Sequence, residues 1–341
     1  MNSNLTMTTE ADVDTDRWVD QFLLLDAHCD SLVLRWSRGD PVDLADVDPA
    51  YQVDLPRLRQ GGMDCLFTYV GDNDLALSSV LIDAVYEMCR AHPDDFCLCR
   101  TRSEVFQARA QGQIAIVMTI EGQKLLDENL SHLRNWHRLG VRVASITHGG
   151  GRRPELQHDP SYFGYIDPAE RENLRQQSKG LTPFGRMALA EMGRLDIAVD
   201  LAHINDAAFW QVIESAECPV CYTHGGCYAL CPHSRALTDD MMKALAEKGG
   251  VMGIAFYKEF IHRTEPTLDR LCDHFLHALE VMGPDHVGIG SDFDGTPRLL
   301  RPIPKDVSML EGLFVALADR GVDQETMRKV AGENFVRLLP D

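Results

Sequence analysis

Short, continuously apolar segments recur along this chain, and segments with helical periodicity lie between them. Eight of the apolar segments have the length of a strand and are rich in β-branched residues, as strands buried on both faces are. They are Phe22–Asp26, Met63–Val70, Gln113–Ile120, Val141–Thr147, Asp196–Leu201, Pro219–Thr223, Val251–Phe256 and His286–Ser291. Apolar residues spaced three and four apart predict helices over Leu77–Cys89, Glu128–Leu139, Pro183–Leu195, Asp206–Ala216, Asp239–Lys248 and Leu268–Met282.

This alternation predicts an α/β fold. Start and stop signals agree with it, because Asn205 and Thr238 can cap the helices that they precede, and Gly140, Gly249 and Gly283 follow helices where a left-handed residue is needed. Eight strands alternating with helices favour a closed (β/α)8 TIM-like barrel. An open doubly wound sheet is the alternative. No G-x-G-x-x-G follows the first strand, which disfavours a nucleotide-binding version of that sheet.

Two stretches fall outside the alternation. Residues 1–18 are polar and acidic, so we expect a flexible N-terminal tail in front of a single barrel domain over residues 19–341. Residues 149–180 follow the fourth strand and predict a long loop that is Gly-rich at its start and aromatic in its middle. A loop at this place either closes the substrate pocket or forms a subunit contact, and the sequence leaves both interpretations open.

Composition and charge narrow the class of protein. A formal net charge of −19 over 341 residues argues against binding nucleic acid or an anionic membrane, because both require a basic face. The N-terminus has no secretory signal pattern, and no apolar run reaches the length of a membrane span. Ten scattered cysteines then indicate reduced thiols in a cytoplasmic protein. A homodimer is left open.

Histidine and carboxylate residues, which can bind metals or transfer protons, lie where six of the expected strands end. A barrel carries its active site at that end of its strands. A single histidine after a strand is usually structural, but six coincidences of His or carboxylate at one end favour a functional site. The six segments are Asp26-Ala27-His28-Cys29-Asp30, Glu121-Gly122, Thr147-His148-Gly149, Asp200-Leu201-Ala202-His203, Thr223-His224 and Ser291-Asp292-Phe293-Asp294.

These residue types predict a dinuclear metal site. His28 and Asp30 lie two apart, so in an extended segment they project to the same side and form a two-ligand pincer. His203 and His224 come from neighbouring strands and can converge on a second ion, and Glu121 can bridge the two ions through its two oxygens. Imidazole and carboxylate ligands fit zinc, with manganese or cobalt as substitutes.

Such a pair of ions supports hydrolysis of an amide bond. Two zinc ions per chain can share one bridging hydroxide, acidify it and polarise the scissile carbonyl. Asp292 then has the position of the general base that takes the water proton and passes it to the leaving amine. The prediction is therefore a TIM-like barrel of the metal-dependent hydrolase type.

In combination and order, the conspicuous segments resemble the membrane (renal) dipeptidase family of the amidohydrolase superfamily, in a bacterial-type soluble form. The similarity runs from about Leu23 to Leu339. The chain departs from the family at Ala27, where Gly is usual, and after His148, where GGGRR replaces a segment that usually starts with Asn. Side-chain preference therefore cannot be transferred. The similar segments are DAHCD, DLPRLRQGGMDCLF, IEG, LGVRVASITH, GLTPFGR, DLAH, THGGCYALCPHSRALTDDMM, GIAFY, GIGSDFDG and GENFVRLL.

The resemblance implies a binuclear zinc site with the same five ligands: His28 and Asp30 on one ion, His203 and His224 on the other, and Glu121 between them.

The resemblance also implies the remaining roles around these metals. Asp292 would handle the proton, and His148 would stabilise the tetrahedral oxyanion. Arg235 would hold the substrate carboxylate, with Tyr257 beside it. The planar guanidinium fork supports the role of Arg235 independently, because it matches a carboxylate better than an ammonium group does.

We therefore expect a zinc-dependent dipeptidase that cleaves small L,L- and also L,D-dipeptides with a free C-terminal carboxylate. An N-acyl amino acid deacylase or a β-lactam-type amidase with the same binuclear site is the alternative. Substrate profiling separates them, because only the dipeptidase needs a free amino group. A third interpretation is a non-catalytic metal-binding relative, which should have lost ligands or Asp292, whereas all of these are present.

Overall fold

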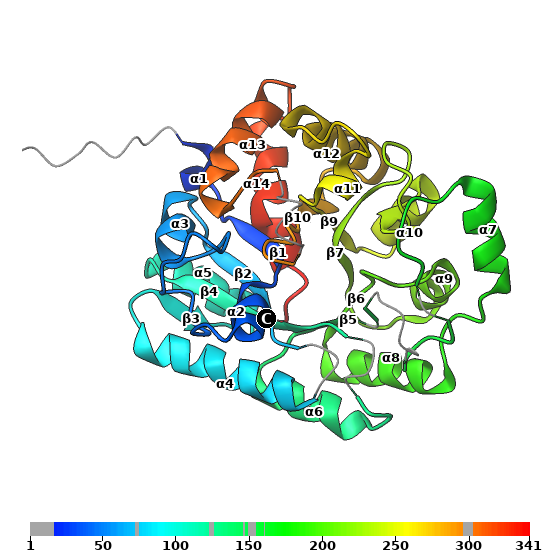
Figure 1. The fold of residues 1–341 in the computed structure, drawn as a ribbon, viewed down its shortest axis with the longest axis horizontal. Coiled ribbons are helices and arrows are strands. Elements are labelled where there is room, and N and C mark those ends of the chain that lie inside the picture. Colours follow the sequence, from blue (N-terminus) through cyan, green and yellow to red (C-terminus); the bar gives the residue numbers. More distant parts are fainter. Residues whose placement is uncertain are drawn as a thin grey trace, which may run out of the picture.

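The eight apolar segments form the strands of a closed parallel barrel (Figure 1). The structure is a computed structural model that describes residues 17–71, 75–122, 126–145, 147–148, 155–159, 161–295 and 303–341. Each predicted segment contains or overlaps one barrel strand, so the predicted fold is confirmed. The strands are β1 (Leu25–Cys29), β2 (Cys65–Tyr69), β4 (Ile114–Ile120), β5 (Val143–Ser145), β6 (Ala198–Asp200), β7 (Val220–Cys227), β9 (Val251–Ile254) and β10 (Val287–Ile289).

Pairing between the first barrel strand, β1, and the last, β10, closes the ring. β1 pairs with β10 on one side and with β2 on the other, and β2 pairs with β4 along its whole length. Two very short strands join the barrel strands from outside: β3 (Phe96–Leu98) pairs with the start of β4, and β8 (Ala236–Leu237) pairs with the end of β7. The sequence pattern did not predict them, because periodicity is not measurable over two or three residues.

Alternate strand residues fill the interior of the barrel, since successive side chains of a strand point to opposite faces. Cys65 and Phe67 of β2 belong to the interior cluster, whereas Leu66 between them packs against the surrounding helices. The end of the chain closes the barrel opposite the carboxyl ends of the strands: Phe335 belongs to the same interior cluster, and its ring lies 6.1 Å from that of Phe67.

Helices surround the barrel, as Figure 1 shows. The six predicted helices are confirmed, with bounds shifted by two residues at most, and Asn205 and Thr238 cap the helices that follow them. The helices are α1 (Trp18–Gln21), α2 (Ser31–Arg38), α3 (Leu55–Gln60), α4 (Leu75–Ala91), α5 (Arg102–Ala110), α6 (Leu130–Leu139), α7 (Pro168–Gln177), α8 (Pro183–Leu195), α9 (Asp206–Ser215), α10 (Asp239–Glu247), α11 (Lys258–Ile261), α12 (Leu268–Met282), α13 (Leu310–Ala318), α14 (Gln324–Arg328) and α15 (Asn334–Val336), with the 3-10 turn η1 (Val307–Met309) and the π-helical turn η2 (Lys329–Glu333).

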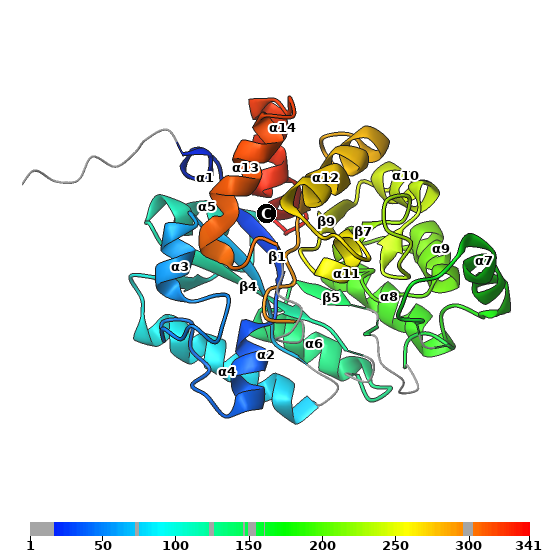
Figure 2. The same ribbon diagram turned by 45° about the horizontal axis from the view of Figure 1, so that its top comes forward.

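The start of the described chain packs against its last third. Figure 2 shows α1 beside α13. The carboxylate of Glu311 accepts the backbone N–H groups of Trp18 and Val19, each at 3.1 Å, and so caps α1. Of the tail expected over residues 1–18, residues 1–16 lie outside the described part, and Trp18 already belongs to this helix.

The expectation of an irregular loop over residues 149–180 is wrong for its second half. Residues 168–177 form α7, which begins with Asp167 as its cap and Pro168 in its first turn. This helix carries few apolar residues, so it lacks the periodicity by which the other helices were predicted. Residues 149–154 and 160 of the same stretch lie outside the described residues. None of the described helices is both long and apolar enough to cross a bilayer.

Candidate metal centre and active site

Polar side chains from six strands meet at the carboxyl end of the barrel. His28 and His224 lie within β1 and β7, and the other side chains follow the last residue of their strands. All of them except His148, which is partly exposed, are buried. The structure thus brings together the residues for which the sequence predicted a metal, proton-transfer or oxyanion role, namely His28, Asp30, Glu121, His148, His203, His224 and Asp292.

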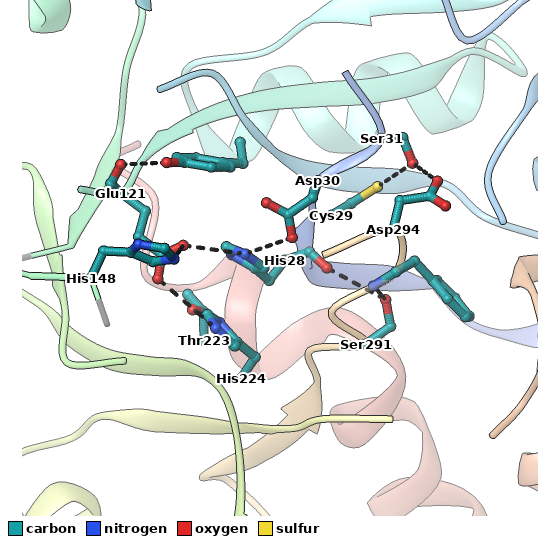
Figure 3. A network of polar contacts seen from close by, with 12 residues as sticks. His28, Cys29, Asp30, Ser31, Glu121, His148, Thr223, His224, Ser291 and Asp294 are labelled. Carbon is teal, nitrogen blue, oxygen red and sulfur yellow. Dashed lines mark hydrogen bonds and ion pairs between the residues drawn. The ribbon is translucent and has the colours of Figure 1, made fainter. Parts of the chain in front are cut away.

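The Glu121 carboxylate lies at the centre of this cluster. Its Oε1 is 3.2 Å from His203 Nε2 and 3.9 Å from His224 Nε2, and its Oε2 is 3.6 Å from His28 Nε2 and 4.0 Å from His148 Nε2. Figure 3 shows the carboxylate pointing into the space between the imidazoles of His28, His148 and His224. Each oxygen of Glu121 therefore faces a different part of the histidine set, as a carboxylate that bridges two ions would.

Two groups of three side chains have donor atoms that all lie within 4.8 Å of one another: Glu121 with His203 and His224, and Asp292 with His28 and His224. Asp30 Oδ2 also lies 3.2 Å from His28 Nε2. The carboxylates of Asp30 and Asp292 converge over Gly295, where a Cβ atom would come within 2.2 Å of an oxygen of each. Glycine at this position therefore leaves room for both carboxylates.

Backbone irregularities aim several of these side chains. The register of β1 with β2 shifts around His28, and that of β7 with β9 shifts around His224. Such shifts bend a strand and redirect a side chain. His203 and Asp292 have positive φ angles of 64° and 62°, a left-handed conformation that is uncommon outside glycine. Uncommon backbone at four of the site residues is typical of a functional site.

Burial makes the charges of the cluster costly. It raises the pKa of the Glu121 and Asp292 carboxyls to about 8, and it lowers the pKa of the His203 and His224 imidazoles well below their usual range. Burial also opposes protonation of His28, but the neighbouring carboxylates outweigh it and raise the pKa of His28 to about 10. Burial alone therefore favours the protonated forms of Glu121 and Asp292, and a bound cation would favour their charged forms instead.

These donors fit divalent metal ions. The neutral imidazoles of His203 and His224 each have a nitrogen lone pair to offer, and the carboxylates of Asp30, Glu121 and Asp292 supply oxygen ligands and negative charge. Histidine and carboxylate together are the usual ligands of zinc in hydrolases. A cation between them would also relieve the repulsion between the buried carboxylates.

The two residues expected to bind the substrate carboxylate lie beside the metal cluster. Arg235 Nη1 is 2.6 Å from His203 Nε2, and its Nη2 donates to the carbonyl oxygen of His224 at 3.1 Å. Tyr257, which directly precedes α11, is buried. The Phe260 ring lies 5.4 Å from the Arg235 guanidinium and 4.8 Å from the Tyr257 ring. The side chains of Arg235 and Tyr257 therefore both lie against the ring of Phe260.

The described part of the 149–180 stretch approaches the site from behind His203. The hydroxyl of Ser161 donates to the His203 carbonyl oxygen, and the N–H of Ser234, next to Arg235, donates to the Gly164 carbonyl at 2.9 Å. A cavity of about 600 Å³ lies on the outer side of this segment, against α7 and the start of α9. Its lining includes Tyr162, Phe163, Ile166, Leu174, Ile204 and Asn205.

Asp200 and Thr223 stand at predicted strand ends, but the sequence pattern predicts no role for them. In the structure the Thr223 hydroxyl lies 2.9 Å from His224 Nδ1 and donates to Asp200 Oδ2 at 2.6 Å. In the sequence, this contact is marked by a hydroxyl residue, Thr223, directly before the candidate ligand His224. Its partner across the sheet is visible only in the fold, because Asp200 lies on a different strand.

Comparison with known proteins identifies the family. The model of the family described as membrane dipeptidase (peptidase family M19) matches residues 14–341. The chain is 32% identical to dipeptidase aclJ of Aspergillus oryzae, over 93% of this chain and 78% of that relative. It is 31% identical to dipeptidase verJ of Clonostachys rogersoniana, over 93% of this chain and 83% of that relative.

A solved structure agrees. A metallopeptidase from Rhodobacter sphaeroides, liganded with a phosphinate mimic of the dipeptide L-Ala-D-Ala, superposes with a TM-score of 0.83 at 26% identity and covers 93% of this chain and 98% of its own. Fold, buried His/Glu cluster and relatives together show that this chain belongs to the membrane dipeptidase family, peptidase family M19, and is a metallodipeptidase.

Proposed function

We propose that this enzyme hydrolyses dipeptides with a free C-terminal carboxylate, of L,L and also L,D configuration, with two zinc ions per chain. The observation that carries the proposal is the position of Glu121, whose two oxygens face His203 and His28 at 3.2 and 3.6 Å. The dipeptide mimic bound to the Rhodobacter relative supports the L,D part, because its C-terminal residue has D configuration. When bound, the two ions would act as Lewis acids and activate a water nucleophile at neutral pH.

In this proposal five protein residues are metal ligands. His28 and Asp30 would hold one ion and His203 and His224 the other, and Glu121 would serve both. Elemental analysis of fully active enzyme should find two ions per chain, and a maximum of one would contradict the binuclear site.

Proton transfer is assigned to Asp292. Its carboxylate lies in the cluster close to His28 and His224, so it can take a proton from the attacking water and deliver it to the leaving amine. Asp292→Asn should retain both ions and lower turnover at least about 100-fold, the size typical of a general acid–base group. If metal is lost together with activity, Asp292 is a ligand rather than a proton carrier.

Recognition of the substrate carboxylate is assigned to Arg235, with Tyr257 beside it, and stabilisation of the oxyanion to His148. Arg235→Ala should raise KM strongly for free dipeptides, because a buried charge-assisted fork is lost. C-terminally amidated analogues lack that carboxylate, so their already poor hydrolysis should change little. An equal loss for both substrate types would make Arg235 a structural residue.

The position of residues 149–180 directly after His148 supports a role of this segment in side-chain selectivity. Shortening this segment should then change which dipeptides are accepted, with both metals still bound. A subunit contact is the other interpretation, and Tyr162 and Phe163 are exposed enough to serve in one. Unchanged selectivity together with loss of a homodimer in light scattering would favour that interpretation.

The decisive test of the substrate class is a panel of L,L-, L,D- and D,D-dipeptides, with N-acylated and C-terminally amidated controls. Hydrolysis that requires both a free amino group and a free carboxylate supports the dipeptidase. Preference for N-acyl amino acids or β-lactams would support the alternative amidase activities instead. We further propose a bacterial-type, soluble, cytoplasmic enzyme, which fractionation of cells that express the native gene would test.

A further inference from the structure

A hydroxyl group contacts the side of the His224 ring that faces away from the metal cluster. Thr223 Oγ1 lies 2.9 Å from His224 Nδ1 and 2.6 Å from Asp200 Oδ2. The other oxygen of Asp200 accepts the backbone N–H groups of Ala202 at 3.0 Å and Thr223 at 2.9 Å. Asp200, Thr223 and His224, which we call the Thr223 bridge, are all buried and join the end of β6 to the middle of β7.

The number of hydrogens in the bridge fixes its direction. A threonine hydroxyl has one hydrogen, and a carboxylate only accepts. Thr223 therefore donates its hydrogen to Asp200, and its oxygen accepts a hydrogen from His224 Nδ1. A neutral imidazole carries its hydrogen on one nitrogen only, so His224 Nε2 keeps a lone pair. That nitrogen faces His203 Nε2 at 3.3 Å and Glu121 Oε1 at 3.9 Å.

The backbone around Thr223 leaves the bridge little freedom. A Cβ atom at Gly253 would come within 1.9 Å of the Thr223 carbonyl oxygen, and one at Gly290 within 1.7 Å. Two neighbouring strands thus approach Thr223 so closely that only glycine fits opposite its carbonyl. This close approach fixes the backbone of Thr223, from which its hydroxyl group extends.

A second aspartate at the opposite side of the barrel makes a similar clamp without reaching an imidazole. Asp26 accepts the backbone N–H of Ser291 at 2.8 Å and that of His28 at 3.3 Å, and its other oxygen accepts the Ser291 hydroxyl. The Ser291 oxygen then accepts the Phe293 N–H at 3.0 Å. This clamp holds the backbone at β1 and β10, whereas the Thr223 bridge continues to the ring of a candidate ligand.

We propose that Asp200 and Thr223 are positioning residues that hold His224 in its Nδ1–H tautomer, with the Nε2 lone pair directed at the metal site. The inference rests on the proposed function for the identity of the ligand set, but the tautomer itself exists independently of any ion. Partners of this kind orient a ligand histidine and raise its basicity, and their loss typically costs about 10- to 100-fold in metal affinity.

The test compares three full-length variants. Thr223→Val removes the hydroxyl and keeps the shape, and Thr223→Ser restores a hydroxyl. Thr68→Val is the matched control, because Thr68 is a buried threonine of β2 whose hydroxyl has no hydrogen-bond partner among the described residues. Zinc affinity is measured by competition with a chelator, and the tautomer of His224 by long-range nitrogen–proton NMR of metal-free protein, with His224→Gln to assign the signal.

We expect the Nδ1–H tautomer in the wild type, in Thr223→Ser and in Thr68→Val, with zinc affinities within about threefold of one another. In Thr223→Val the tautomer should become mixed, and one zinc should bind about 10- to 100-fold more weakly. An Nε2–H tautomer in the wild type, or an unchanged tautomer and zinc affinity in Thr223→Val, overturns the inference. A wild type that binds no zinc but shows the Nδ1–H tautomer would contradict the proposed metal function and leave the bridge standing.

Discussion

Two buried histidines meet strand β7 and use their ring nitrogens differently. His274, on α12, accepts the Cys227 N–H at Nδ1 and donates from Nε2 to the Ile261 carbonyl, at 3.0 and 2.9 Å. Both of its nitrogens are therefore occupied by backbone groups. His224, within β7, has the Thr223 hydroxyl on Nδ1 and only other candidate ligands near Nε2 among the described residues.

Burial does not separate these two histidines. Both are about 1% exposed, and burial lowers the pKa of both imidazoles. The difference lies in the second nitrogen: backbone groups on both sides make His274 a structural tie between β7 and α11, whereas a hydroxyl on one side leaves His224 a lone pair for a metal. The contrast suggests that a buried histidine should be judged by the partners of both nitrogens.

The largest expected effect comes from replacing the candidate metal ligand, His224. His224→Gln should lower kcat/KM more than about 1,000-fold, because the loss of a ligand should exceed the 10- to 100-fold typical of losing its hydrogen-bond partner. The midpoint of thermal unfolding of the metal-free protein should hardly change. Steady-state kinetics, elemental analysis and calorimetry measure the three quantities. Normal metal content and activity in this variant would show that His224 is not a ligand.

Replacing the structural histidine, His274, should have the opposite result: a loss of stability with little loss of turnover. His274→Leu leaves the Cys227 N–H and the Ile261 carbonyl buried without partners, which should cost roughly 2 to 6 kcal/mol of the free energy of unfolding. Urea unfolding measures this loss. Turnover per bound pair of metals should stay within about threefold of the wild type at a temperature where the variant is folded. A selective loss of turnover without loss of stability would place His274 in the active site instead.

The pH dependence of stability should also test the structural role of His274, without any metal or substrate. Burial lowers the pKa of His274 to about 4, against 6.5 for an exposed histidine. Between these values the unfolded chain binds the extra proton, so the stability that depends on His274 is complete above about pH 6.5 and is lost as the pH falls towards 4. The loss amounts to about 3 kcal/mol. Urea unfolding across this pH range should show a shallower acid slope in His274→Leu than in the wild type, and equal slopes would contradict the assignment.

The smallest expected effect comes from a hydroxyl that hydrogen-bonds the backbone, not the side chain, of a candidate ligand. Tyr69 donates to the Glu121 carbonyl oxygen at 2.6 Å, and its ring lies 5.8 Å from that of His28. Tyr69→Phe keeps the ring and should lower the free energy of unfolding by about 1 kcal/mol. Zinc affinity by chelator competition should fall less than about threefold. A loss as large as that expected for Thr223→Val would mean that backbone and side-chain support matter equally for the ligands.

The sequence by itself determined the barrel and the place of the site. Periodicity depends only on neighbours in the chain, so the eight strand segments and the six principal helices could be predicted from local pattern, with their caps. The same local pattern placed His28, Glu121, His203 and His224 at strand ends, where any parallel barrel gathers its side chains. Short β3 and β8 and the polar helix α7 escaped prediction because too few apolar residues mark them, and the helices α2, α5 and α13 were not predicted either.

Only the tertiary structure decided what each buried polar residue does. Whether an imidazole has a lone pair left depends on groups that are distant in sequence: Asp200 lies 24 positions before His224, and Ile261 lies 13 before His274. The Asp26–Ser291 clamp joins residues 265 apart. Hydrogen-bond partners across elements are set by how the strands and helices pack, which no local pattern encodes, and they separate a candidate metal ligand from a structural histidine of the same burial.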